Sequence, residues 1–258
     1  RSSAASDVYK RQQHAGVPVL LAALVVIIVG GLMGLLNGVL VGYFGFPPLI
    51  ATLATSYAFA SIAMVASGQA PISGPKIAAT HELTRNLSLF GDVQLPIQVL
   101  SFLLPAMVIS WFMLEHTTWG RSLLAIGTND TAAAYAGQNI RWTRASAYMA
   151  SGLLSGVAAV VNVAQFASAR PDAGTSGNGM ALPAITIAAL GGVLISGGLA
   201  RVSGVITSAL LITWLNAALL ISFQGSLGPR TQLLALGLLL ICAVLMNSYA
   251  ARRYGLRA

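Results

Sequence analysis

The chain has 258 residues, of which 56% are hydrophobic and only 8% are charged, and its formal net charge is +8. Soluble domains carry about 25% charged residues, so this composition excludes a soluble globular protein. It also argues against nucleic-acid binding, because the basic residues lie singly or in pairs between apolar runs and form no basic stripe. The sequence therefore predicts an integral membrane protein.

The first 16 residues do not fit this composition. They are polar, they begin without Met, and they lack the charged-then-apolar order of a signal peptide. We expect residues 1–16 to be a leader foreign to the chain. A transmembrane domain is then expected over residues 17–249, followed by a cytoplasmic tail over residues 250–258.

The transmembrane domain is predicted to be all-α, a polytopic helical bundle with about seven spans. Each long uncharged run supplies the roughly 20 apolar residues that a helix needs to cross a bilayer. Pro47 and Pro48 predict a tight hairpin after the first span, because proline lacks an amide donor. Glycines at every fourth position from Gly30 to Gly42, and at Gly152 and Gly156, predict close helix packing. The predicted spans are Val17–Tyr43, Leu49–Ser67, Pro96–Leu114, Ala145–Ala167, Ala181–Leu199, Val202–Ser222 and Thr231–Tyr249.

The basic residues indicate the orientation, because cytoplasmic loops are enriched in Lys and Arg. A cytoplasmic C-terminus places the loop 115–144 inside and leaves fewer basic residues in the outer loops, although residues 1–16 would offset this bias. The inside residues are then Arg121, Arg141, Arg144, Arg201, Arg252, Arg253 and Arg257, and the outside residues are Lys76, Arg85, Arg170 and Arg230.

The polar residues within the predicted spans are uncharged. An amide or hydroxyl in lipid is costly unless it bonds between helices or lines a wet cavity, and both interpretations stay open here. Such groups would suit a path for a neutral, hydroxyl-rich solute. The candidates for this path are Asn37, Thr52, Asn162, Gln165 and Asn216.

The sequence offers neither an energy source nor a catalytic centre. Lys10 and Lys76 are the only lysines, and neither closes a phosphate-binding loop. All six carboxylates fall in loops or at span edges, which argues against proton coupling. The run Gly174–Gly177 resembles an intramembrane serine-protease motif, but it is expected in a polar loop and has no histidine base. The single Cys242 excludes an internal disulfide, and no metal site is predicted.

The cytoplasmic loop 115–144 contains a predicted short helix over Thr131–Ala136. Asn129 is a good N-cap, Asp130 is favourable at the positive end of a helix, and Gly137 is a typical helix stop. A linker would not need caps at both ends. We therefore expect a docking element for a soluble partner, with an interfacial helix that has no partner as the alternative.

Several of these runs together resemble one known family. They are Gly34–Val41, Pro47–Thr55, the Trp119–Gly137 loop, Leu190–Gly192 and Ser196–Gly198. In this order and spacing they resemble the permease subunits of ribose/xylose/galactose-type ABC importers. The resemblance implies about ten spans, a second permease copy or paralogue, and a periplasmic or lipid-anchored solute-binding protein. It also implies cytoplasmic ATPase subunits that carry ATP and Mg²⁺, with no cofactor in this chain, and a location in the bacterial inner membrane.

The resemblance also implies which residues couple the permease to the ATPase subunits. The family's coupling-loop pattern is matched, with Asp130 in place of Glu, by Gly127, Asn129, Asp130, Ala133 and Gly137. The proline at position 183 resembles the residue found there in the branch that imports a furanosyl autoinducer. The run Ser168–Asp172 resembles the corresponding run of the rhamnose-type branch. The family's earlier Gly-Ile-Asp-Leu-Ser-Val-Gly segment is absent. The resemblance therefore implies the C-terminal two thirds of a permease.

The sequence thus predicts the permease subunit of an ABC importer that moves a small neutral sugar or sugar-like solute and is not itself an enzyme. The alternative is an ion-coupled secondary transporter or a channel, in which a span broken near Gly191 and Gly192 exposes carbonyl groups to an ion.

Overall fold

The computed structural model describes residues 19–68, 86–90, 93–96, 99–166, 175–194, 197–223 and 227–253. The predicted leader, residues 69–85 of the polar loop and the run Ser168–Gly174 lie outside these described residues. The chain divides into two compact units, Arg1–Ala106 with Arg141–Ser176, and Met107–Ile140 with Gly177–Ala258.

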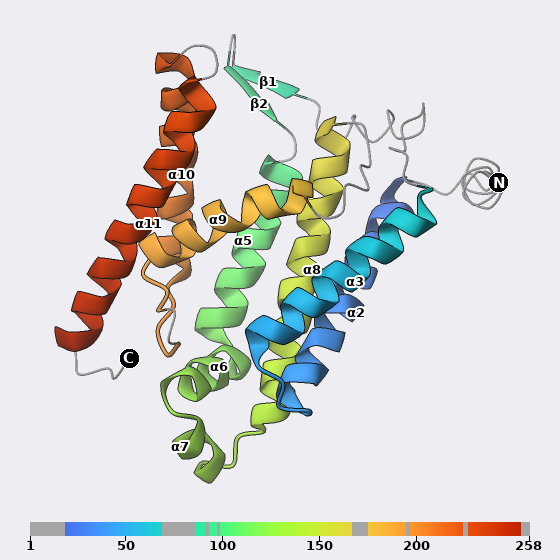
Figure 1. Cartoon of the computed structure of the whole chain (residues 1–258), viewed down its shortest axis with the longest axis vertical. Helices are drawn as coiled ribbons and strands as arrows, with labels where there is room; N and C mark the ends of the chain where they lie inside the picture. Colours follow the sequence, from blue (N-terminus) through green and yellow to red (C-terminus); the bar gives the residue numbers. More distant parts are fainter. Residues whose placement is uncertain are drawn as a thin grey trace. The chain divides into compact units, whose positions relative to one another are not determined.

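The first unit is built on three long helices, α2 (Val19–Gly42), α3 (Pro48–Ala66) and α8 (Ile140–Phe166) (Figure 1). Pro48 is the first residue of α3, where its missing amide and fixed φ cost nothing. A small antiparallel hairpin, β1 (Asn86–Phe90) and β2 (Val93–Pro96), pairs Asn86 with Pro96. This hairpin is an addition to the all-α fold that the sequence predicts.

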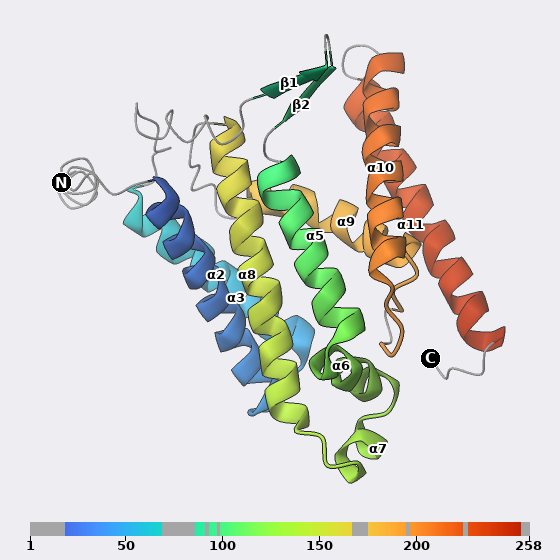
Figure 2. The ribbon, with the colours of Figure 1, turned by 180° about the vertical axis from the view of Figure 1, so that it is seen from behind.

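Helices α2 and α8 pack through glycines, and they lie side by side in both views (Figures 1 and 2). A methyl group on Gly30 would lie 2.6 Å from the carbonyl oxygen of Gly152, and one on Gly156 would lie 2.7 Å from Cα of Ile27. These are backbone contacts that no side chain can relieve. The close packing predicted from the two sets of glycines is confirmed.

The π-helical turn η2 (Val99–Leu103), helix α5 (Leu104–Trp111) and the π-helical turn η3 (Phe112–His116) follow one another without a break. Together they form one apolar stretch, Val99–His116, long enough to cross a bilayer. The amphipathic helix α6 (Thr118–Thr128) and the short helix α7 (Asp130–Tyr135) come next.

The second unit also contains α9 (Thr175–Leu190), α10 (Val202–Ser222) and α11 (Leu227–Arg253). The hydroxyl of Ser208 on α10 donates to the carbonyl oxygen of Ile187 on α9 at 2.7 Å. Helices α10 and α11 pack against each other, and Ile212 and Leu236 are fully buried. Thr175 begins α9, so the prediction of a polar loop is wrong for Thr175–Gly177, and Ser176 lies in the first helical turn.

Five helical stretches among the described residues are long and apolar enough to span a bilayer, and two shorter apolar stretches accompany them. They correspond in order to the seven predicted spans, so the chain is a polytopic, multi-pass membrane protein of the all-α class. Some predicted edges are wrong. Helix α8 begins at Ile140, five residues before the predicted Ala145, and includes Arg141 and Arg144, whose long side chains can reach the membrane surface.

The fifth predicted span, Ala181–Leu199, is wrong at its C-terminal end, because α9 stops at Leu190. Gly192 adopts φ of 82°, its amide donates to Ala189 at 3.2 Å, and the amide of Val193 donates to Ala188 at 3.1 Å. This is a Schellman motif, which ends a helix at a left-handed glycine. Val193 and Leu194, which follow it, lie outside the helix.

Candidate functional site

Helix α7 is capped at both ends by residues within the loop 115–144. The side chain of Asn129 accepts a hydrogen bond from the amide of Ala132 at 3.0 Å. At the other end Gly137 adopts φ of 77°, its amide donates to Ala134, and that of Gln138 donates to Ala133. These bonds form a second Schellman motif. The predicted short helix is confirmed, with both of its ends one residue earlier than predicted.

The five residues predicted for coupling differ in their exposure and in the helix to which they belong. Asn129, Asp130 and Gly137 are exposed, so they lie at the surface of α7 and its caps. Ala133 is only 5% exposed and therefore faces the protein. Gly127 belongs to the last turn of α6, where its backbone lies against Gly197 and Gly198.

Sequence reasoning missed Tyr135 and the helix α6. Tyr135 is 89% exposed on α7, which makes it the most prominent large side chain of this helix. Exposed aromatic residues are frequent anchors of protein interfaces. Their exposure depends on which side of α7 faces the protein, and six residues carry too little periodicity to predict it.

Helix α6 begins at a side-chain cap. The hydroxyl of Thr117 accepts a hydrogen bond from the amide of Gly120 at 3.2 Å and donates to the carbonyl oxygen of Met113 at 2.5 Å. A methyl group on Gly120 would lie 2.6 Å from the same carbonyl oxygen. The threonine cap at Thr117 is a signal that could have predicted this helix.

In the first unit, the path candidate Asn37 has a partner. The hydroxyl of Thr55 donates to Oδ1 of Asn37 at 2.6 Å and so joins α3 to α2. Thr52 lies one turn before Thr55, and its hydroxyl bonds carbonyl oxygens of its own helix, from Pro48 at 2.8 Å and Leu49 at 3.2 Å. Asn37 and Thr52 therefore lie near one another, because Thr55 bonds Asn37 and is one helical turn from Thr52.

The structure does not bring Asn162 and Gln165 to this position. Helices α2 and α8 are antiparallel, and Gly38 on α2 contacts Ala145 on α8. Asn162 lies 17 residues farther along α8, which is roughly 25 Å at about 1.5 Å per residue. The four candidates of the first unit therefore form two separate groups at different depths.

Asn216 is the path candidate on α10. Its Oδ1 atom is buried and has no hydrogen-bond partner among the described residues. A buried carbonyl without a partner costs about 1–3 kcal/mol. This atom is therefore available as an acceptor within the second unit.

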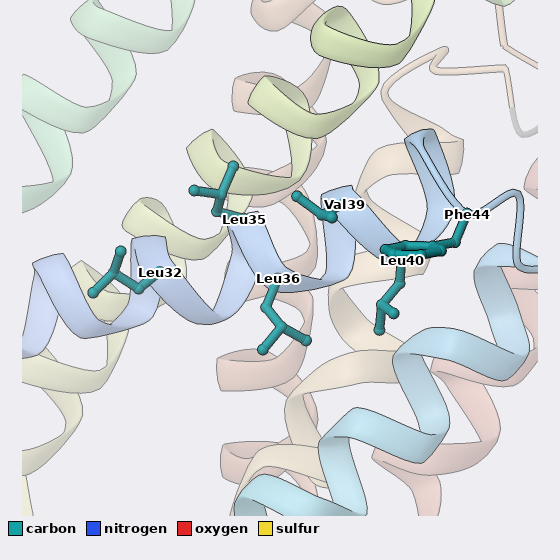
Figure 3. Close-up of a pocket in the computed structure, with 6 residues that line it drawn as sticks. All are labelled: Leu32, Leu35, Leu36, Val39, Leu40 and Phe44. Carbon is teal, nitrogen blue, oxygen red and sulfur yellow. The ribbon is translucent and has the colours of Figure 1, made fainter.

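The surface of α2 carries a shallow apolar depression of about 420 Å³ (Figure 3). All the residues that line it come from α2 and the turn after it, and all are apolar. It offers no hydrogen-bonding side chain to a polar solute. The lining residues are Leu32, Leu35, Leu36, Val39, Leu40 and Phe44.

Comparison with known proteins agrees with this architecture. The family described as branched-chain amino acid transport system / permease component matches residues 3–244. The chain is 35% identical over 248 residues to the autoinducer 2 import system permease protein LsrD of Photorhabdus luminescens, covering 95% of this chain and 72% of that protein. It is 34% identical over 244 residues to LsrD of Escherichia coli strain K12, covering 93% and 71%.

No solved structure matches the chain. The family match covers most of the sequence, and the relatives align over more than two thirds of their own length. The resemblance inferred from the sequence motifs is therefore confirmed. The chain belongs to the family of transport-system permease components and is a membrane permease of the sugar-type ABC importer class.

Proposed function

We propose that this permease is powered by separate cytoplasmic ATPase subunits, which dock on α7 and its two caps. The observation that carries this proposal is the pair of caps at Asn129 and Gly137, which hold a helix of only six residues. Isolated helices this short are unstable in water, so the caps support a helix that is presented to a partner. The exposed Tyr135 supplies an apolar anchor at its surface.

We assign the energy source to the partner because the residues favour neither ATP binding by this chain nor coupling to an ion or proton gradient. Neither lysine of the sequence lies in a phosphate-binding loop. Among the described residues the carboxylates are Glu115, at the end of the span Val99–His116, and Asp130, on α7. Ion and proton pathways usually place a carboxylate within a span. We therefore assign ATP and Mg²⁺ to the ATPase subunits, and the chain itself is proposed to be no enzyme.

The proposed solute is small, neutral and rich in hydroxyl groups. Asn37, Thr52, Thr55 and Asn216 are polar but uncharged, and the free acceptor of Asn216 would be satisfied by a solute hydroxyl. The similarity to autoinducer 2 import permeases makes that molecule the first solute to test. A solute-binding protein on the outer side, a second permease copy or paralogue and a bacterial inner membrane complete the proposal.

Docking is tested by copurification of the ATPase subunit with the permease. Tyr135→Ala should reduce the copurified ATPase at least about fivefold, because loss of an interface aromatic costs 1–2 kcal/mol or more. Trp214→Ala is the matched control, since Trp214 is 85% exposed in the same unit but lies within the span α10. Equal losses in both variants, or in neither, would contradict docking at α7.

The energy source is tested by uptake into vesicles that contain the permease with and without the ATPase subunits. We expect accumulation of solute against a gradient only when the ATPase subunits and ATP are present. Accumulation driven by an ion gradient in vesicles without the ATPase would instead establish a secondary transporter.

A further inference from the structure

The end of α6 rests directly on the loop that joins α9 to α10. A methyl group on Gly127 would lie 3.2 Å from Cα of Gly198, and one on Gly197 would lie 2.9 Å from the carbonyl oxygen of Gly127. A methyl group on Gly198 would lie 2.8 Å from the hydroxyl oxygen of Thr128 and 3.2 Å from its Cα. The two segments therefore touch mainly through their backbones.

This loop is held together by its own hydrogen bonds. The amide of Gly197 donates to the carbonyl oxygen of Leu194 at 2.9 Å, and the amide of Leu194 donates to that of Leu199 at 3.0 Å. Gly197 and Gly198 adopt φ of 92° and 89°, a conformation that side chains rarely tolerate. The described part of the loop thus contains two consecutive positions that favour glycine.

The same loop is joined closely to the helices on either side of it. A methyl group on Gly191, just after α9, would lie 2.7 Å from Cα of Val205 in the first turn of α10. The hydroxyl of Ser208 on α10 bonds the carbonyl oxygen of Ile187 on α9. A displacement of the loop would therefore move the adjoining ends of α9 and α10 together.

Helix α6 is also joined to α7 by a single residue. Asn129 is the C-cap of α6, where its amide donates to Ala125 at 3.1 Å, and it is the N-cap of α7. No flexible linker separates the two helices. Thr128 and Gly127 lie only two and three residues before Asp130, the first residue of α7, so a displacement of α7 acts directly on them.

We propose that Gly127, Thr128, Gly197 and Gly198 form a joint that passes the movement of α7 to α9 and α10 during transport. Backbone contacts suit this task because close-packed atoms transmit a displacement that a flexible side chain would absorb. The four residues are positioning residues, since they act through the helices they connect. This inference rests on the proposed function, because the ATPase supplies the movement.

The test compares two left-handed glycines of the same loop in the complex of permease, ATPase subunits and solute-binding protein in vesicles. Gly198→Ala adds a methyl group against Thr128, whereas a methyl group at Gly192, with φ of 82°, meets nothing within 4 Å. Both substitutions carry a similar backbone strain. Gly198→Ala should lower ATP-driven uptake at least about tenfold relative to Gly192→Ala, within the usual range of coupling effects.

A second pair tests the joint from the other side without any backbone strain. Gly127→Ala adds a methyl group against Gly198, while a methyl group at Gly237 on α11 meets nothing within 4 Å. Gly127→Ala should reduce uptake as Gly198→Ala does, and Gly237→Ala should not. In both joint variants the ATPase should still copurify, because α7 is unchanged, but the loaded binding protein should no longer stimulate ATP hydrolysis.

A rescue experiment separates a broken joint from a misfolded chain. The atom closest to a methyl group at residue 198 is the hydroxyl oxygen of Thr128. Thr128→Ala removes it, so the double variant Gly198→Ala with Thr128→Ala should recover part of the lost uptake. Absence of any recovery would show that contact with the Thr128 hydroxyl does not cause the lost uptake, and it would contradict the joint.

The remaining outcomes distinguish this inference from the proposed function. If the wild-type complex transports and the joint variants transport as well as their controls, the joint is overturned alone. If the joint variants lose the ATPase subunit, the contact serves assembly and the joint is again overturned. If the wild-type chain binds no ATPase subunit, the proposed function fails and the joint with it.

Discussion

Single hydrogen bonds decide which polar residues of the spans hold the helices together. Thr52 and Thr55 lie one turn apart on α3 and look equivalent in the sequence. Only the hydroxyl of Thr55 reaches across to α2, where it bonds Asn37 at 2.6 Å. The hydroxyl of Thr52 remains with its own helix. The interhelical interpretation therefore applies to the Asn37–Thr55 pair, while a role in the path stays a prediction for Asn37 and Thr52.

This difference gives a matched pair of variants. Thr55→Val should lower the free energy of unfolding by about 0.6 kcal/mol or more, the scale of hydrogen bonds between membrane helices. Thr52→Val should cost less, because no partner on another helix is left unsatisfied. Reversible unfolding in mixed detergent micelles measures both values. An equal cost for the two variants would show that the bond to Asn37 contributes nothing.

Asn129 is the second residue whose role can be isolated. Asn129→Ala removes the acceptor for the amide of Ala132 and should destabilise α7 by about 1 kcal/mol. Amide hydrogen exchange over Asp130–Tyr135 should accelerate roughly fivefold. Asn129→Asp keeps a capping oxygen and serves as the control. Unchanged exchange in Asn129→Ala would contradict a stabilising cap.

At the level of elements, the glycines of α2 and α8 explain how two apolar helices associate inside lipid. Lipid chains are as apolar as leucine, so close backbone contact has to replace the hydrophobic effect. A methyl group on Gly38 would lie 2.6 Å from the carbonyl oxygen of Ala145. The two helices cannot approach this closely with any larger residue at that position.

Gly38→Ala should therefore destabilise the chain by about 1–3 kcal/mol, because the helices must separate to admit the methyl group. Gly237→Ala on α11 is the control, since a methyl group there meets no neighbour within 4 Å. That control should be neutral or stabilise by up to about 1 kcal/mol through helix propensity. Thermal unfolding in detergent measures both changes, and a neutral Gly38→Ala would contradict close packing at this position.

The errors in element prediction have identifiable causes. The end of α9 was predicted too late because Val193 and Leu194 continue the apolar pattern of the helix, although Gly192 ends it with a left-handed turn. The apolar pattern does not predict helix α6, because Thr118–Thr128 lies between two spans and is too short to cross a bilayer. In both cases a cap decides the boundary, and the apolar pattern alone does not reveal it.

At the level of the whole molecule, many large apolar side chains of the described residues are exposed. Residues such as Leu234, Ile221 and Val65 expose more than 60% of their side chains, which is the pattern of a protein surrounded by lipid. The arginines of the predicted inner segments predict which end faces the cytoplasm. In that predicted orientation, α6 and α7 would lie where a cytoplasmic ATPase could reach them.

Cysteine labelling tests this orientation on a background in which the single Cys242 is replaced by Ser. Ser122→Cys on α6 should react with a membrane-impermeant thiol reagent only in inside-out vesicles. Ser88→Cys in β1 should react only in vesicles of the opposite orientation. Labelling of both positions from the same side would refute the predicted topology.

The sequence by itself determined the class of the protein, the approximate spans, the glycine contacts and the capped helix α7. These features depend on composition, helical periodicity and local capping, all of which act within a few residues. The family resemblance likewise rested on motifs that can be read along the chain.

Only the tertiary structure decided which residues meet. It paired Thr55 with Asn37, separated Asn162 from both, left the Oδ1 atom of Asn216 without a partner among the described residues, and turned Tyr135 outward. It also brought Gly127 against Gly198, which lies 71 residues later in the chain. Such contacts depend on how the segments pack, because two backbones approach closely only where small residues of both segments face each other.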